Sequence, residues 1–128
     1  MVSEITKGIK VEVVTEYQNE YSSPAQSHFV FTYRINIENN SSNTVQLMNR
    51  IWHIHDAGRP EKEIVGEGVV GQQPVLEPGE SHQYVSGCNL NSGLGKMYGS
   101  FEMEKVISGE RIMISIPEFT MIVPFKLN

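Results

Sequence analysis

The chain has 128 residues, a length that suits a single hydrophobic core, so we expect residues 1–128 to form one domain. Its 15 acidic and 10 basic side chains give a net charge of −5, and no basic cluster interrupts that balance. This charge excludes nucleic acid, bound through neutralised phosphates, as the expected partner.

The sequence also indicates where the protein acts. Its one cysteine, Cys88, cannot form an internal disulfide, whereas a secreted sandwich of this size would more often carry a pair. No run approaches the ~18 apolar residues of a membrane span. The amino-terminal MVSEITKGIK lacks the apolar stretch of a secretory signal. We therefore expect a cytoplasmic protein that does not insert directly into a membrane.

The first half of the chain predicts extended strands over residues 10–16, 28–38 and 44–55. The strand at 28–38 alternates strictly, and this period of two indicates one buried side. Its apolar set is Phe29, Phe31, Tyr33, Ile35 and Ile37. Along 44–55 the apolar residues change face near Asn49, which predicts a β-bulge or a twist there.

Turns and glycines interrupt the middle of the chain. Turn signals at 56–61 and 76–81 flank a glycine-rich loop. A short strand is predicted at 82–87, followed by a longer glycine-rich connection at 89–96.

The last part of the chain predicts strands at 97–106, 111–117 and 119–127, with a hairpin turn at SGE, residues 108–110. Pro124 has no backbone N–H, so the last strand is expected to lie partly at a sheet edge. That edge could pair across a homodimer, although Pro124 and Lys126 could equally protect it from pairing.

Together these elements predict an all-β fold. No window sustains a helical repeat with caps, and seven or eight short strands are separated by turn signals. Such a pattern is typical of two antiparallel sheets packed as a β-sandwich.

The segment GEGVVG places Gly66, Gly68 and Gly71 in a frame that often marks a phosphate-binding loop. A dinucleotide site needs a helix directly after the last glycine, and the QQP that follows excludes one. Two interpretations stay open. In the first, the glycines permit unusual backbone angles in a wide loop that crosses the sandwich. In the second, successive N–H groups form a nest for an anion, with nearby cations from Arg50, Arg59 and Lys62.

Other candidate residues carry weaker signals. His53 and His55 lie two apart on a predicted strand, but no third ligand is evident, so no metal site is predicted. Cys88 lacks a convincing His and Asn or Asp arrangement and is expected to be buried. Ser86 fits the opening of a turn better than a nucleophile. The sequence therefore predicts no catalytic residue, no cofactor and no enzymatic activity.

Three segments together form a specific pattern: RIWHIHDAGRPEKEIVGEGVVGQQPVLEPGESHQYVSGCNL (50–90), GKMYGSFEMEK (95–105) and SIPEFTM (115–121). In these segments the chain resembles the ApaG family. The resemblance covers most of the chain, and the amino-terminal third is similar mainly in its strand pattern.

The resemblance implies an immunoglobulin or fibronectin type III-like antiparallel β-sandwich. It also implies a non-catalytic binding or regulatory module, associated in bacteria with magnesium and cobalt homeostasis, chiefly efflux. Related domains serve as interaction modules, so an unknown protein partner is expected. The alternative is a sensor that binds a nucleotide or pyrophosphate. The resemblance places that ligand at Gly66, Gly68 and Gly71, and Arg50 and Lys62 would supply positive charge nearby.

Overall fold

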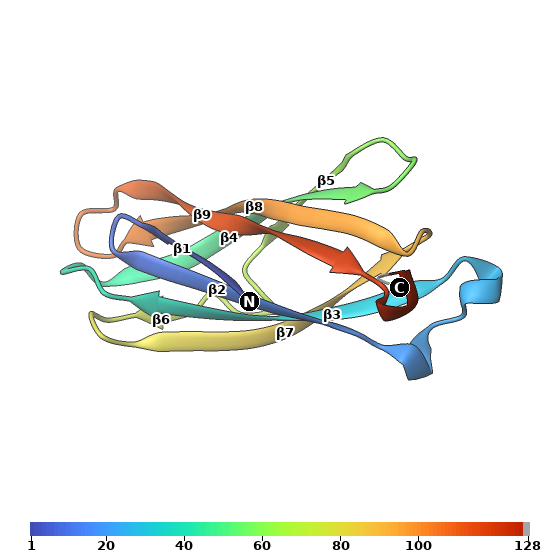
Figure 1. Ribbon diagram of the computed structural model, residues 1–128. Coiled ribbons are helices and arrows are strands. Elements are labelled where there is room, and N and C mark those ends of the chain that lie inside the picture. Colours follow the sequence, from blue (N-terminus) through green and yellow to red (C-terminus); the bar gives the residue numbers. More distant parts are fainter. Residues whose placement is uncertain (127–128) are drawn as a thin grey trace.

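The computed structural model describes residues 1–126, which form two antiparallel β-sheets packed face to face (Figure 1). The first sheet contains, in spatial order, β1 (Val2–Thr6), β2 (Ile9–Tyr17), β3 (Phe29–Asn39) and β7 (Ser81–Leu90). The second contains β5 (Lys62–Glu67), β4 (Val45–Asp56), β8 (Leu94–Lys105) and β9 (Arg111–Ile122). The short β6 (Val75–Leu76) also pairs with β4. The predicted all-β sandwich is confirmed.

Helical structure among residues 1–126 is limited to short 3-10 turns, with no α-helix. These turns are η1 (Asn19–Tyr21), η2 (Pro24–Gln26) and η3 (Pro124–Lys126). None of these helices has the length and apolar character needed to cross a membrane.

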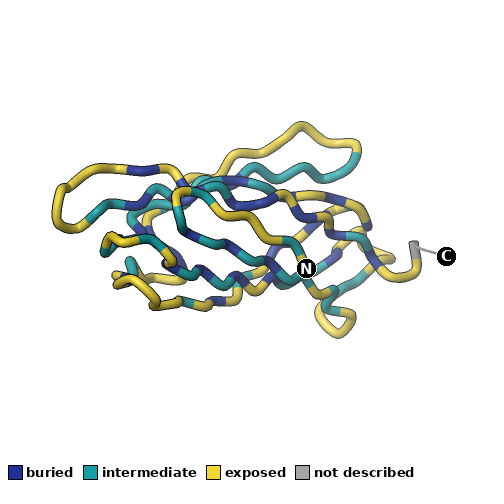
Figure 2. The backbone as a smooth tube through the Cα atoms, turned by 60° about the vertical axis from the view of Figure 1, so that its left-hand side comes forward, coloured by how far each residue is buried: buried dark blue, intermediate teal, exposed yellow. Residues whose placement is uncertain are grey.

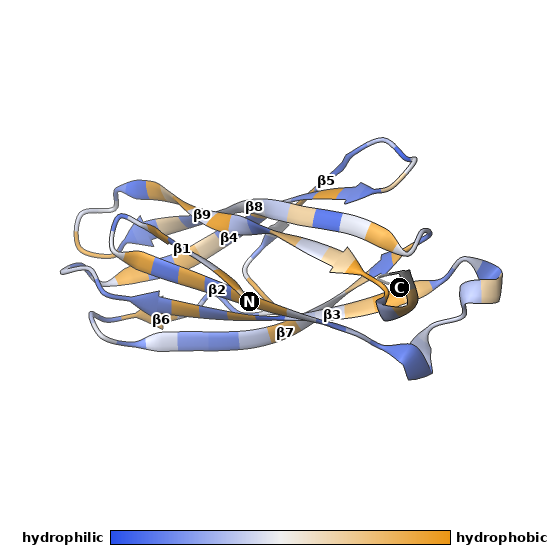
Figure 3. Ribbon diagram, in the orientation of Figure 1, coloured by the Kyte–Doolittle hydropathy of each residue, from blue (hydrophilic) through white to orange (hydrophobic). Residues whose placement is uncertain are grey.

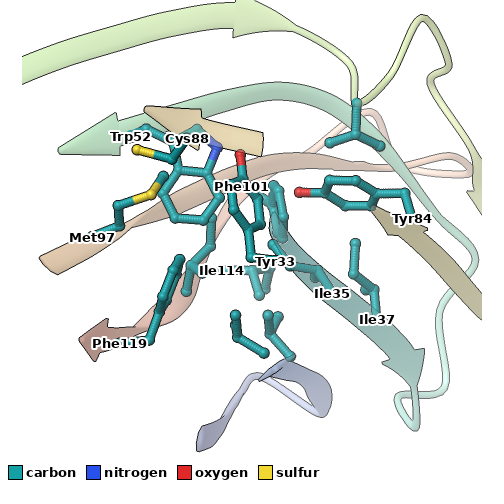
Figure 4. Close-up of a cluster of buried hydrophobic side chains, with 14 of the residues drawn as sticks. Tyr33, Ile35, Ile37, Trp52, Tyr84, Cys88, Met97, Phe101, Ile114 and Phe119 are labelled. Atoms are coloured by element: carbon teal, nitrogen blue, oxygen red, sulfur yellow. The ribbon is translucent and has the colours of Figure 1, made fainter. Parts of the chain in front are cut away.

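The core forms because apolar and polar residues alternate along the strands, as the colours of β2 show (Figure 3). The predicted apolar face of β3 is buried, and it packs against the inner face of the second sheet. Tyr33 of β3 meets Trp52 of β4 and Phe119 of β9, with ring centroids 5.4 and 5.7 Å away (Figure 4). These aromatic contacts join the two sheets.

The change of face predicted near Asn49 is confirmed as an irregularity in β4. The register between β4 and β8 shifts between Leu47 and Asn49. Val45 and Leu47 face the core before this bulge, and Trp52 faces it afterwards. Arg50 lies two residues before Trp52 on the same strand face, so it also points between the sheets.

Two boundaries in the middle of the chain differ from the prediction. β7 continues to Leu90 and β8 begins at Leu94, so the long connection predicted at 89–96 is wrong. β5 was not predicted, because the charges at Lys62, Glu63 and Glu67 interrupt the apolar alternation.

The strands predicted at 111–117 and 119–127 are also corrected, because β9 is one strand with Pro117 inside it. Pro117 fits there because β9 ends its sheet, where a missing N–H need not remove a ladder hydrogen bond. After β9 the chain turns into η3, where Phe125 is exposed. Leu127 lies outside the described residues.

The first interpretation had the glycine loop cross the sandwich, and this is wrong. The loop stays on the second sheet. It runs from β5 to β6 along the edge of β4, where the N–H of Leu47 donates to the carbonyl of Pro74. The chain reaches the first sheet only at residues 77–80, between β6 and β7. The glycines therefore shape one edge of the second sheet.

The two sheets meet closely along one side of the sandwich. There β1 and β2 lie beside β9, and the N–H of Ser115 donates to the Thr6 hydroxyl. On the opposite side β7 ends the first sheet and β5 ends the second. The β4–β5 hairpin projects there from the body, with β5 exposed (Figure 2). We call this the open side.

Candidate functional site

A cleft occupies the open side, between β7 on the first sheet and β5 with the glycine loop on the second. It consists of two adjoining cavities of about 360 and 280 Å³. Both cavities are lined by Tyr33, Arg50, Trp52 and Ser86. Tyr84 and residues 69–71 of the loop line the larger cavity, and Lys62 and Ile64 line the smaller. We call this the open-side cleft.

Arg50 lies in both cavities because the β4 bulge has turned it inward. Its Nη1 donates to the backbone carbonyls of Glu67 and Gly68, at 3.0 and 2.9 Å. Gly66 lies opposite Arg50 on β5, and a Cβ there would come within 2.6 Å of the guanidinium. Gly66 thus makes room for Arg50. Neither Arg50 nor Lys62 forms an ion pair within residues 1–126.

The backbone N–H groups of the glycine loop are mostly used inside the protein. Gly68 donates to a carbonyl of β4, and Val69 and Gln72 each donate to the carbonyl of the other. Val70 and Gly71, with φ of +46° and +75°, form the tight turn between them. Because the carbonyls of Glu67 and Gly68 face Arg50 and the N–H groups of Gly68, Val69 and Gln72 are paired, the geometry favours a steric role for the glycines. The anion nest stays a prediction.

The mouth of the cleft is apolar and exposed. Val70, Val85 and Ile64 are 64%, 55% and 39% exposed, one each from the glycine loop, β7 and β5. Val70 also has a positive φ that β-branched residues rarely adopt. Strained backbone of this kind clusters at functional sites. The mouth is therefore a candidate contact surface.

Two tyrosine side chains enter the cleft from the first sheet. Tyr84 is 8% exposed, yet its hydroxyl has no hydrogen-bond partner within residues 1–126. That hydroxyl points inward, toward the side chains of Tyr33 and Phe101 (Figure 4). Burial raises the pKa of both phenols, and the Arg50 guanidinium opposes the rise in each. Both phenols therefore remain protonated at neutral pH and can donate hydrogen bonds.

The structure brings together part of the residue set predicted for an anion. Arg50 and Gly71 line the larger cavity, and Lys62 lines the smaller. The carbonyl of Gly68 accepts a hydrogen bond from Arg50, and a Cβ at Gly68 would overlap the carbonyl oxygen of Gln72. Arg59 pairs instead with Asp56, whose carboxylate lies 4.0 Å from its Nε.

His53 and His55 share the face of β4 that points away from the core. His53 stacks on Tyr98 with ring centroids 4.9 Å apart. Its Nδ1 lies 3.8 Å from a carboxylate oxygen of Glu63 and 3.9 Å from one of Glu61. Within residues 1–126, no three His, Cys, Asp or Glu side chains are grouped so that they could hold a metal ion.

The two potential nucleophiles near the cleft lack activation. Burial raises the pKa of the Cys88 thiol to about 11, so little thiolate exists at neutral pH. Ser86 lines both cavities, but no histidine within the described part of the chain lines either one as its base. Neither side chain is therefore activated as a nucleophile by the described residues that line the cleft.

Two cleft residues were missed at the level of sequence. Tyr33 was counted among the apolar residues of its strand, and Tyr84 lay on a strand predicted to be short. The available signal was the phenol itself, because an inward-facing tyrosine usually needs a partner for its hydroxyl. Their position beside Arg50 could not be predicted, since it depends on the bulge in β4.

Comparisons with known proteins agree with this fold. The family model of the ApaG domain matches residues 19–105. The Protein ApaG of Brucella canis is 47% identical over 124 residues, which cover 97% of this chain and 95% of that protein. The Protein ApaG of Brucella anthropi is 44% identical over the same length. The crystal structure of an ApaA protein from Bordetella pertussis is 38% identical, with a TM-score of 0.87, and the match covers 91% of this chain and 94% of that one.

Proposed function

Because the chain belongs to the ApaG family, we propose that it is a non-catalytic binding and regulatory module that acts through a protein partner. Its place in the cell is the cytoplasm, and its role is in magnesium and cobalt efflux, as the family resemblance implies. The transport itself belongs to that partner. The chain contributes recognition.

The open-side cleft is the observation that carries this proposal. It combines exposed apolar residues at its mouth with a cation and a buried hydroxyl inside, namely Arg50 and Tyr84. Recognition sites commonly have this composition, with an apolar surface and a few polar groups that fix orientation. Its serine and thiol have no activating base among the described residues, which favours binding over catalysis.

The alternative is a sensor for a nucleotide or pyrophosphate at Gly66, Gly68 and Gly71. The guanidinium of Arg50 favours it, and Lys62 adds a second cation to the cleft. The pairing of the Gly68, Val69 and Gln72 N–H groups disfavours it, because a nest needs unpaired donors. We therefore place this alternative second.

The efflux role is tested with a strain that lacks the gene. After a cobalt load, the deletion strain is expected to retain more Co²⁺ than the wild type, and restoring the gene should return the content to normal. Mass spectrometry of whole-cell Co²⁺ and Mg²⁺ provides the measurement. Unchanged metal contents in the deletion strain would contradict the proposal.

Titration calorimetry of the purified chain separates the alternatives. We expect weak binding of Co²⁺ and no binding of pyrophosphate or ATP at millimolar concentration. Pyrophosphate binding that is lost in Gly68→Val would favour the sensor. Tight Co²⁺ binding that disappears when His53 and His55 are replaced by alanine would instead identify those two side chains as metal ligands.

A further inference from the structure

We propose that the free edge of β7 binds an extended segment of the partner, and that one carboxylate of this segment enters the open-side cleft to meet Arg50 and the Tyr84 hydroxyl. The segment would add a strand to the first sheet. This inference rests on the proposed function, because it supplies the surface and the chemistry of the partner that function requires.

β7 is a long strand edge without the usual protection. Its ten residues include no proline, lysine, arginine, aspartate or glutamate. The other strands that end a sheet carry such residues: Glu4 in β1, Lys62, Glu63 and Glu67 in β5, and Arg111, Pro117 and Glu118 in β9. Charges and prolines keep edges from pairing. Within residues 1–126, β7 pairs only with β3, so its outer backbone groups are free to pair with another strand.

The second sheet extends over the place that an added strand would take. Ile64 of β5 pairs in register with the buried Trp52 and shares its face, yet it remains 39% exposed. A strand added to β7 would lie about 4.8 Å beyond it, below this face of β5. Its inward side chains would cover Ile64, and its outward ones would lie beside the exposed Val85 on the other face of β7. The apolar mouth of the cleft thereby becomes part of an interface.

The polar groups inside the cleft determine the chemistry of the bound segment. The Tyr84 hydroxyl is a buried donor without an acceptor in the described part of the chain. Arg50 bonds two backbone carbonyls, but no carboxylate there balances its charge. One carboxylate would satisfy both groups, and hydrogen bonds between such charged groups are the strong ones.

Charge complementarity favours an acidic segment over a second copy of this chain. The β7 strand of a second copy carries no carboxylate that could enter the cleft. Among residues 1–126, Lys62 adds a second unpaired cation to the lining, and Glu67 is the only acidic residue in it. An added strand that brings an aspartate or glutamate inward therefore fits the cleft best.

A display library of random linear peptides, selected against the purified chain, tests the proposal. Enriched peptides are expected to carry alternating apolar residues around an aspartate or glutamate. Their binding should shift the amide NMR signals of residues 83–87. The proposal would be overturned by any of four results. These are enriched peptides without an acidic residue, NMR shifts confined to other strands, no enrichment at all, or a homodimer through β7 in sedimentation.

Tyr84→Phe separates a binding role from a structural one. The variant removes a hydroxyl without a partner, so its melting temperature should stay equal or rise, while affinity for the selected peptides should fall about tenfold. Tyr17→Phe is the matched control. Tyr17 also has a buried hydroxyl without a partner in residues 1–126, but it packs against Phe31 and Phe125. Its loss should leave affinity unchanged, and equal affinity in Tyr84→Phe would contradict the proposal.

Arg50→Gln provides a second, independent variant. A selection repeated with it is expected to lose the acidic preference, and a retained preference would contradict the role of Arg50.

The efflux assay then separates the proposed binding surface from the proposed function. A strain with Tyr84→Phe that lacks peptide affinity but keeps normal efflux would overturn the surface alone. A deletion strain with normal efflux would overturn the function even if acidic peptides bind β7.

Discussion

The three glycines of GEGVVG meet three different steric requirements. Gly66 leaves room for the Arg50 guanidinium, and Gly68 brings its backbone close to the carbonyl of Gln72. Gly71 has a φ of +75° in the turn that follows. Each requirement arises from the protein's own backbone or side chains. A frame that resembles a phosphate loop thus arises here from local packing.

Replacing Gly68 by alanine is expected to destabilise the protein more than replacing Gly71. Their φ values of +63° and +75° penalise any side chain. A Cβ at Gly71 would meet nothing within 4 Å, whereas one at Gly68 would overlap backbone. We expect a loss of about 1 kcal/mol for Gly71→Ala and about 3 kcal/mol for Gly68→Ala in the free energy of unfolding. Urea denaturation gives both values, and equal losses would show that the loop moves to relieve the overlap.

The sequence identified several residues of this site, but it did not predict their roles. It identified the glycines and Arg50, but it left open whether the glycines only permit unusual backbone angles or whether the loop N–H groups bind an anion. The structure favours the first interpretation, because the carbonyls of Glu67 and Gly68 face the Arg50 guanidinium. That the Tyr84 hydroxyl lacks a hydrogen-bond partner within residues 1–126 also could not be predicted, because pairing depends on neighbours far along the chain.

At the scale of elements, the bulge in β4 determines what the cleft contains. An uninterrupted strand would keep Leu47, Asn49 and Ile51 on one face, and Arg50 would point to solvent. The register shift before Asn49 reverses this arrangement. The sequence predicted the shift because its apolar residues change face. It did not predict β5, whose charged residues conceal the strand that Arg50 packs against.

Asp56, the last residue of β4, fixes the tight connection between β7 and β8. Its carboxylate accepts hydrogen bonds from the N–H of Asn91 at 2.6 Å and from the N–H and hydroxyl of Ser92 at 3.1 and 2.6 Å. Desolvation acts to raise the pKa of Asp56, but these hydrogen bonds, together with Arg59, lower it overall. The ionised carboxylate is therefore the form that the fold favours.

The lowered pKa of Asp56 predicts how stability depends on pH. A carboxyl group that is more acidic in the folded state stabilises the protein above its ordinary pKa of 3.8, and this contribution is lost as the pH falls through the folded pKa. Asp56→Asn should therefore lower the free energy of unfolding by about 1–2 kcal/mol at neutral pH. The difference from wild type should shrink below about pH 4. Urea denaturation across pH measures it, and a constant difference would contradict the role of the charge.

At the scale of the whole molecule, Cys88 reports on the integrity of the sandwich. Its thiol is buried beside Trp52 and Met97, and Cys88 lines the smaller cavity of the open-side cleft (Figure 4). Because the pKa of this thiol is raised to about 11, alkylation by iodoacetamide at pH 8 should be very slow in the native protein. Labelling, followed by mass spectrometry, should rise with urea in parallel with global unfolding. Labelling well below the unfolding transition would show that β7 detaches locally.

The fold class was predictable because alternation is a local property, and nearly every strand shows it. The order of the strands was not, since pairs such as β3 with β7 join residues far apart in the chain. The open side depends on that order, because it determines which strands end each sheet. The segment SHQYVSGCNL has the pattern of an ordinary strand, and the sequence does not show that it lies at the edge of a sheet.

The contact between β1 and β9 affects how the chain reaches its fold. The Ser115 N–H and the Thr6 hydroxyl that it meets are 109 residues apart. During synthesis, β1 and β2 leave the ribosome before the other strands of the sandwich, and β9, which lies beside them, leaves after the others. Closing so large a loop costs entropy before any contact repays it, so folding is expected on the slow, millisecond-to-second scale of β-sandwiches. Until β9 emerges, Val11 and Val13 remain uncovered, and the nascent chain exposes an apolar face on which chaperones can act.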